Sequence, residues 1–238
     1  MHTNRVALIT GANKGLGFEI ARQLGRRSVT VVLGARDDTK ANEAANKLKA
    51  EGIDAHAVKL DVTDEADVAA LPAFFESKFG RLDILVNNAG VMLDFGGVTR
   101  ATFRQTYETN VFAPYSITEA LLPLLKASPA GRIVNHSSSM GSMTLMGDPN
   151  GFSPEMAAPA YCSSKAALNM LTVTTARRLE GTKVKVNSAD PGWVKTDMGT
   201  DRAPLEVADG AKTAVALALL PDDGPTGGYF HLGETLPW

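Results

Sequence analysis

Two patterns of apolar residues alternate along the chain, and together they predict its secondary structure. Short apolar runs predict strands at residues 6–10, 29–33, 55–60, 84–86, 132–136, 183–188 and about 228–232. Apolar residues that recur every three or four positions predict helices at residues 15–26, 40–51, 65–79, 99–127, 160–180 and 205–220. This alternation of strands and helices favours an α/β fold, in which helices cover both faces of a parallel sheet.

The sequence predicts one domain over residues 1–238. No linker, low-complexity tract or solenoid-type repeat divides the chain. The one long irregular stretch, residues 140–159, is rich in Gly, Pro, Met and Ser. Since a loop of this length inside a domain is usually functional, we expect it to form a lid over the substrate. We expect a second mobile region at about residues 192–210.

Composition and charge narrow the function classes. The content of 44% hydrophobic and 21% charged residues is that of an ordinary globular protein. The net charge of −2 provides no basic field for nucleic acid or an acidic membrane. The single cysteine, Cys162, excludes an intrachain disulfide and favours a reducing compartment. No apolar run approaches the ~18 residues of a membrane span, and the first strand begins too early for a signal peptide. We therefore expect a cytoplasmic protein that binds neither nucleic acid nor membrane.

The run TGANKGLG at residues 10–17 joins the first predicted strand to the first predicted helix. Strand, glycine-rich turn and helix is the arrangement of a dinucleotide site. The glycines allow the backbone to approach a pyrophosphate, and the helix presents free N–H groups and the positive end of its dipole to the phosphates. A turn that merely joins a strand to a helix is the alternative for this run taken alone.

The end of the second predicted strand faces the adenosine ribose in such folds. Asp37 lies at the spacing that favours NAD, because a carboxylate there accepts a hydrogen bond from the ribose 2′-hydroxyl. Arg36 is closer to the end of the apolar run, and Lys14 in the glycine turn adds a second cation. Two cations near one phosphate favour the 2′-phosphate of NADP(H), which is the predicted cofactor.

Two further strand ends carry candidate cofactor contacts. Asp61, which precedes Val62, is placed either to accept a hydrogen bond from the adenine amino group or to form a turn with Thr63 before the next helix. The run NNAG at residues 87–90 ends the fourth predicted strand. Its small residues and amides suit close packing against a cofactor ring, and they equally suit a turn.

Tyr161 and Lys165 lie at the start of a predicted helix and, being four positions apart, project from one face. An ammonium near a phenol stabilises the phenolate, so we expect Lys165 to lower the pKa of Tyr161 from its reference of about 10. Tyr161 would then exchange a proton near neutral pH. Taken alone, such a pair is more often found on a surface.

The fifth predicted strand runs into the serines at residues 137–139, which a parallel sheet delivers to the edge that carries the glycine turn. A serine there can donate a hydrogen bond to a substrate carbonyl oxygen, and a serine-rich turn is the alternative. Neighbouring His136 has no second His or Cys near it in the sequence, so we interpret it as a strand residue and expect no metal site. The serines also lack the elbow motif of a hydrolase.

Asn110 lies within a predicted helix, where asparagine is unfavourable, and Pro114 follows it. These residues predict a kink that frees a backbone carbonyl to bind water. An ordinary polar residue on the helix surface is the alternative.

In their order along the chain these motifs resemble those of the short-chain dehydrogenase/reductase family. The resemblance rests on TGANKGLG, Asp61, NNAG, Asn110, the serine run, YCSSK at residues 161–165 and PGWVKT at residues 191–196, and it covers essentially the whole chain. It implies a Rossmann fold, a doubly wound parallel sheet of about seven strands in the order 3-2-1-4-5-6-7 with helices on both faces.

The resemblance also implies roles for individual residues. Ser138 contacts the substrate oxygen, Tyr161 is the general acid in reduction, and Lys165 binds the nicotinamide ribose and tunes Tyr161. Asn110 holds a water that connects Lys165 to solvent as a proton relay. The cofactor-binding residues implied are Gly11, Asn13, Lys14, Gly15, Leu16, Gly17, Arg36, Asp61, Val62, Asn88, Ala89, Gly90, Tyr161, Lys165, Pro191, Gly192, Val194 and Thr196.

Within the family, GANKGLG, PGWVKTDM at residues 191–198 and the tail LLPDDGPTGGYF are most similar to NADPH-dependent carbonyl reductases. This similarity implies a small-molecule ketone or aldehyde substrate and an alcohol product. Residues 138 and 161 are too close in the chain for the long helical insertion thought to block oligomerisation in the monomeric mammalian type, so a monomer and a homo-oligomer both stay open. The alternatives are an NAD(P)-dependent 3-oxoacyl or polyol dehydrogenase of the same family and, from another class, an inert NADP(H)-binding regulatory protein.

Overall fold

In residues 5–238, which the computed structural model describes, eight strands form one sheet in the order β3-β2-β1-β4-β5-β6-β7-β8. The strands are β1 (Val6–Thr10), β2 (Thr30–Ala35), β3 (Ala55–Lys59), β4 (Ile84–Asn87), β5 (Arg132–His136), β6 (Lys185–Ala189), β7 (Tyr229–His231) and β8 (Glu234–Thr235). The first seven run parallel, and β8 pairs antiparallel with β7. The predicted order of seven strands is confirmed. The eighth, two exposed residues long, has no apolar pattern that would predict it.

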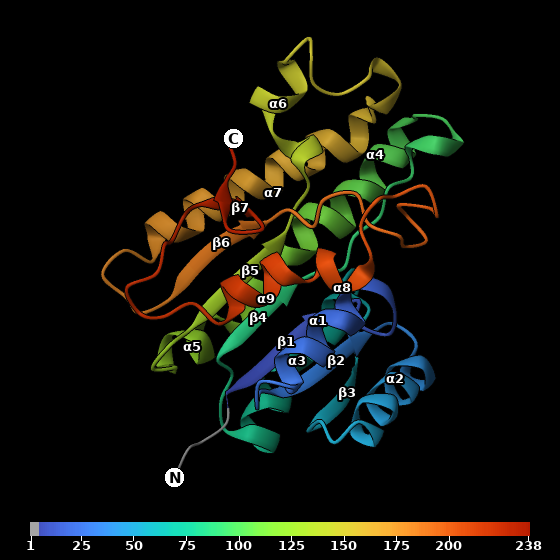
Figure 1. The fold of residues 1–238 in the computed structure, drawn as a ribbon. Coiled ribbons are helices and arrows are strands. Elements are labelled where there is room, and N and C mark those ends of the chain that lie inside the picture. Colours follow the sequence, from blue (N-terminus) through green and yellow to red (C-terminus); the bar gives the residue numbers. More distant parts are fainter. Residues whose placement is uncertain (1–4) are drawn as a thin grey trace.

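Helices cover both faces of the sheet, as Figure 1 shows. One face packs against α1 (Gly15–Gly25), α2 (Asp38–Ala50) and α9 (Lys212–Ala218), and the other against α3 (Glu65–Phe79), α5 (Ala113–Ala127) and α7 (Pro159–Arg178). Successive side chains of a strand point to opposite faces. Accordingly, β1 supplies Ala7 and Ile9 to the first core and Val6 and Leu8 to the second. The predicted doubly wound architecture is confirmed.

The helix predicted at residues 99–127 is interrupted. It consists of α4 (Arg100–Tyr107), a π-helix at Glu108–Phe112 and then α5. Asn110 lies in the π-helix and is fully buried, so the surface alternative for this residue is wrong. Pro114 follows the π-helix in the first turn of α5 and has no N–H to donate to the preceding turn, so the distortion lies at the predicted place and takes the form of a π turn. Similarly, the helix predicted at residues 205–220 divides into α8 (Val207–Gly210) and α9.

The stretch expected to be irregular, residues 140–159, contains the short helix α6 (Met143–Gly147). This helix is attached to residues 237 and 238. The Ser142 hydroxyl donates to the Pro237 carbonyl at 2.7 Å, and the Thr144 hydroxyl and N–H both donate to the Trp238 carbonyl, at 2.8 and 3.1 Å. The Trp238 ring stacks on Tyr229 with a centroid separation of 5.4 Å.

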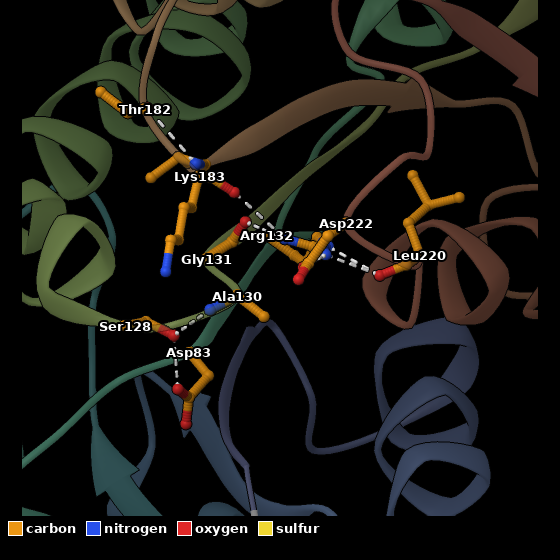
Figure 2. Close-up of polar contacts among 10 residues, drawn as sticks. Asp83, Ser128, Ala130, Gly131, Arg132, Thr182, Lys183, Leu220 and Asp222 are labelled. Carbon is orange, nitrogen blue, oxygen red and sulfur yellow. Dashed lines mark hydrogen bonds and ion pairs between the residues drawn. The ribbon is translucent and has the colours of Figure 1, made fainter.

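A buried arginine closes the sheet at the end opposite the glycine turn. Arg132 begins β5, and its side chain is 1% exposed. Its Nε and Nη2 donate to the Leu220 carbonyl at 2.9 and 2.7 Å, and its Nη1 donates to the Gly131 carbonyl at 2.9 Å (Figure 2). Its Nη2 also pairs with Asp222 at 3.0 Å. These bonds fix the segment that follows α9 to the start of β5.

We expect Arg132→Met to lower the free energy of unfolding by about 3 kcal/mol, because buried carbonyls lose a charged donor that water cannot replace. Denaturant unfolding would show a lower midpoint with an unchanged slope. Asp222→Asn is the matched control. Since the Asp222 side chain is 78% exposed, its loss is expected to cost less than about 1 kcal/mol. Equal losses in the two variants would attribute the stabilisation to the ion pair rather than to the carbonyl bonds.

Candidate active site

A cavity of about 650 Å³ opens at the carboxyl ends of the parallel strands. The predicted cofactor residues that line it are Gly11, Asn13, Lys14, Gly15, Leu16, Gly17, Arg36, Asp61, Val62, Asn88, Ala89, Gly90, Tyr161, Lys165, Pro191 and Thr196. Four other predicted residues do not line the cavity, but each is adjacent in the sequence to a residue that does: Asn110, Ser138, Gly192 and Val194. The cavity is also lined by Ser137 of the predicted serine run and by residues that the sequence did not assign to the site: Ala35, Leu60, Thr63, Val91, Thr109, His136, Lys195, Asp197 and Met198.

The glycine turn is tightly packed at Gly17, whereas at Gly15 it borders open space. A Cβ at Gly17 would come within 2.5 Å of Asn88 Nδ2 and 2.6 Å of the Gly11 carbonyl oxygen. Gly15 has a φ of +59°, and a Cβ there would meet nothing nearer than Thr196, at 3.9 Å. The turn therefore presents bare backbone to the cavity at the start of α1, which is what a pyrophosphate requires.

The end of β4 braces this turn. Asn88 Nδ2 donates to the Thr10 carbonyl at 2.8 Å, and the Thr10 hydroxyl accepts from the N–H groups of Asn88 and Ala89 at 3.0 and 2.9 Å. Asn88 Oδ1 lies 2.8 Å from His136 Nδ1. Burial lowers the pKa of His136 to about 3, so its ring is neutral. The run NNAG thus both lines the cavity and ties three strand ends together.

The two candidate ribose contacts that follow β2, Arg36 and Asp37, differ in whether they line the cavity. The Asp37 carboxylate caps α2 by accepting from the Lys40 N–H at 3.1 Å, and it is not part of the cavity wall. Arg36 lines the cavity, and within residues 5–238 it makes no hydrogen bond or ion pair. Lys14 forms an exposed ion pair with Asp197 across the same cavity. Selection of NAD would need a free carboxylate at this position. The cavity instead has the Arg36 guanidinium there, which has no other partner among the described residues.

Asp61 forms a turn with Thr63, which is one of the two alternatives left open for it. Its Oδ1 accepts from the N–H and the hydroxyl of Thr63, at 3.0 and 2.8 Å, so it forms a turn. The N-cap of α3 is Asp64, which accepts from the Ala66 N–H at 2.8 Å. Asp61 also lines the cavity, so its turn role does not remove it from a cofactor site.

Tyr161 and Lys165 lie one turn apart on α7, and both are buried. The Tyr161 hydroxyl faces the Ser138 side chain, which acts to lower the pKa of the phenol. Lys165 Nζ donates to the His136 carbonyl at 2.8 Å and lies 5.6 Å from the centroid of the Tyr161 ring. The structure therefore joins the serine run and the Tyr–Lys pair, which are far apart in the sequence, at the cavity wall.

The expected lowering of the Tyr161 pKa is wrong for the protein groups described. Burial raises the pKa of Tyr161 to about 12, although the Ser138 side chain acts to lower it. Burial also lowers the pKa of Lys165 to about 8. Desolvation by burial is the largest cause of the rise, and Lys165 is not among the groups that lower the pKa of Tyr161. A proton held this firmly suits an acid that yields it only to a developing oxyanion.

Asn110 supports the Tyr–Lys helix from the side. Its Nδ2 donates to the Ser164 hydroxyl at 3.0 Å and to the Val91 carbonyl at 2.9 Å, and its Oδ1 accepts from the Val91 N–H at 2.9 Å. A Cβ on Gly90 would lie 3.4 Å from Asn110 Oδ1 and 3.5 Å from Lys165 Nζ. Gly90 therefore lies next to both of these polar groups.

Asp94 is a positioning residue that the sequence did not reveal. The N-cap of α7, Ala158, has no side chain that can cap the helix. Asp94 takes this role from a distant loop, because its carboxylate accepts from the Ala160 and Tyr161 N–H groups at 2.9 and 3.2 Å. The only sequence signal is negative: a helix that starts with Ala158-Pro159 lacks a cap of its own.

Two absences hold for the described part of the chain. No helix within residues 5–238 is long and apolar enough to cross a membrane. In the same range, no group of three or more His, Cys, Asp or Glu is arranged to hold a metal ion.

Comparison with known proteins agrees with this geometry. The short chain dehydrogenase family model matches residues 5–206. The chain is 37% identical to carbonyl reductase [NADPH] 1 of Bos taurus, with 99% of each chain covered, and 35% identical to (-)-isopiperitenone reductase of Mentha piperita, with 98% of each covered. The structure resembles that of NADPH-bound carbonyl reductase from chicken fatty liver, with a TM-score of 0.87 at 29% identity over 99% of each chain.

Proposed function

Because the chain belongs to the short-chain dehydrogenase family, we propose that it is an NADP(H)-dependent reductase that converts a ketone or aldehyde to an alcohol. The observation that carries the proposal is Tyr161, which faces Ser138 and lies beside Lys165 in the wall of a cavity that begins at the glycine turn. The NADPH-dependent carbonyl reductase and the terpenoid reductase among its relatives support the same reaction class. An inert binding protein would have no need for this arrangement.

In the proposed reaction each of these residues has a separate role. Bound NADPH supplies the hydride that adds to the carbonyl carbon. Ser138 and Tyr161 donate hydrogen bonds to the carbonyl oxygen, and Tyr161 transfers its proton as negative charge develops there. Lys165 stabilises the resulting phenolate and holds the nicotinamide ribose. Asn110 orders the water through which Lys165 recovers the proton from solvent.

The cofactor would lie along the cavity wall. The glycine turn at residues 11–17 would hold the pyrophosphate, and Arg36 with Lys14 the 2′-phosphate. Asp61 and Val62 would contact the adenine. Residues 88–90 and the segment formed by Pro191, Gly192, Val194 and Thr196 would face the nicotinamide. In this proposal residues 1–238 act as one cytoplasmic domain, and residues 140–159 and 192–210 close over a small-molecule substrate.

The test is to measure NADPH and NADH oxidation side by side with aromatic ketones, aldehydes, quinones and a 3-oxoacyl thioester. We expect turnover of simple carbonyl compounds with at least about tenfold preference for NADPH, which corresponds to ~1.4 kcal/mol. Preference for NADH would overturn the assignment of Arg36 and Lys14. Turnover of the thioester alone would identify a 3-oxoacyl reductase, and tight NADPH binding without turnover would identify an inert site.

Arg36→Ala is expected to weaken NADPH binding about 10- to 100-fold and to leave NADH binding within about twofold, because a charge-assisted bond to a phosphate contributes about 1.5–3 kcal/mol. Quenching of protein fluorescence measures both dissociation constants. Arg104→Ala, which removes an exposed arginine on α4 outside the cavity, is the control. Equal weakening of NADPH and NADH by Arg36→Ala would place Arg36 on a part common to both cofactors.

A further inference from the structure

A buried carboxylate that the proposed chemistry does not use lies beside the catalytic residues. Asp190 directly follows β6 and is 4% exposed. Its Oδ1 accepts a hydrogen bond from the Ser139 N–H at 2.9 Å, and the Gly192 N–H faces its carboxylate. Its Oδ2 lies 3.3 Å from His231 Nδ1. One side chain therefore joins the segment after β5, the segment after β6, and β7.

The segments that Asp190 joins carry different parts of the site. Ser139 is adjacent to Ser138, the proposed partner of the substrate oxygen. Gly192, with a φ of +74°, starts the segment proposed to face the nicotinamide. If the Asp190 carboxylate were lost, the serine segment and the 191–196 segment would be free to shift relative to each other. A displacement of a reacting group by about 1 Å is enough to slow a reaction about 100-fold.

The charge of Asp190 acts on the same residues. The titratable groups that face it are Tyr161 and Lys165 on α7 and Tyr229 and His231 on β7. Burial raises the pKa of Asp190, whereas the Ser139 N–H, His231, the Gly192 N–H and Lys165 lower it. Asp190 in turn raises the pKa of Lys165 and of Tyr161. It favours a charged lysine and a protonated tyrosine, which are the forms that carbonyl reduction needs.

We propose that Asp190 is a positioning residue for the reduction: its carboxylate holds Ser138 and the nicotinamide-facing segment in register beside Tyr161 and Lys165. This inference rests on the proposed function. A neutral amide at this position would offer one acceptor atom in place of two and no charge, so Asp190→Asn separates these roles from simple space filling.

Two measurements test the proposal. In Asp190→Asn, the alkaline limb of kcat/KM for carbonyl reduction should move to lower pH by about one unit, since removal of a nearby negative charge lowers the pKa of both Lys165 and Tyr161. In Asp190→Ala, hydrogen exchange at the Ser139 and Gly192 N–H groups should accelerate at least about tenfold. The exposed Asp223→Asn, in the segment after α9, is the control for both and should leave both unchanged.

An unchanged pH profile in Asp190→Asn together with unchanged exchange at both N–H groups in Asp190→Ala would overturn the proposal. Exchange that accelerates equally across the whole sheet would do so too, because it would indicate general destabilisation. Wild-type protein that binds NADPH but turns over no carbonyl compound would count against the proposed function instead. The exchange measurement needs no turnover, so in that case it alone decides whether Asp190 holds the two segments.

Discussion

Tyr161→Phe is expected to lower kcat for carbonyl reduction by about three orders of magnitude, while the dissociation constant for NADPH stays within about twofold. The variant keeps the buried ring and removes only the hydroxyl, which faces Ser138. Without that hydroxyl, the developing oxyanion loses both its proton source and one hydrogen bond. Single-turnover kinetics with bound NADPH would measure the loss, and fluorescence titration would measure cofactor binding.

Tyr115→Phe is the matched control, because Tyr115 is 47% exposed on α5 and far from the reacting atoms in the sequence. It should retain wild-type kcat. If Tyr161→Phe instead lost NADPH binding, Tyr161 would be needed to shape the cavity, and its assignment as the acid would fail.

Lys165→Met is expected to lose both chemistry and cofactor affinity, with kcat/KM reduced about 1,000-fold and NADPH binding weakened about tenfold. The first loss reflects the missing cation beside Tyr161, and the second reflects a missing donor in the cavity wall. Lys126→Met, an exposed lysine at the end of α5, is the control. Retention of most activity by Lys165→Met would remove Lys165 from the proposed mechanism.

The pH dependence of kcat/KM is a second test of the role of Lys165. Because burial lowers its pKa to about 8, the ammonium is lost as the pH rises through that value. The kcat/KM of the wild-type enzyme should therefore fall above about pH 8, whereas Tyr161, with a pKa of about 12, stays protonated there. In Lys165→Met the alkaline limb near pH 8 should disappear.

The parts of this protein that local sequence determines were predictable. The glycine turn, the strand order and the Tyr161–Lys165 pair follow from short motifs and from the alternation of strands and helices, and the structure has them as expected. The interruption near Asn110 was also predictable in place, because asparagine and a nearby proline are both poor in mid-helix. Its form, a π turn, depends on packing against the Val91 backbone and Ser164.

The parts that long-range contacts determine were not. Asp94 caps a helix that starts more than 60 residues later. Asp190, which follows β6, accepts a hydrogen bond from Ser139, in the segment after the neighbouring strand β5. Neither residue belongs to a motif, and each becomes important only when the sheet brings distant loops to one edge. The direction of the Tyr161 pKa shift was predicted wrongly for the same reason, since sequence spacing gives the charged neighbour but not the depth of burial.

Because of the π turn at Glu108–Phe112, the number of residues between α4 and α5 tolerates no change. A single residue added to a helix rotates everything after it by about 100°. With the π turn in place, Ile117, Leu121 and Leu125 of α5 face the core. Loss or gain of one codon between α4 and α5 would turn these side chains toward water even if every catalytic residue were kept. Small insertions and deletions are therefore expected to accumulate in exposed stretches such as residues 148–156, while the helix pair around Asn110 diverges by substitution alone.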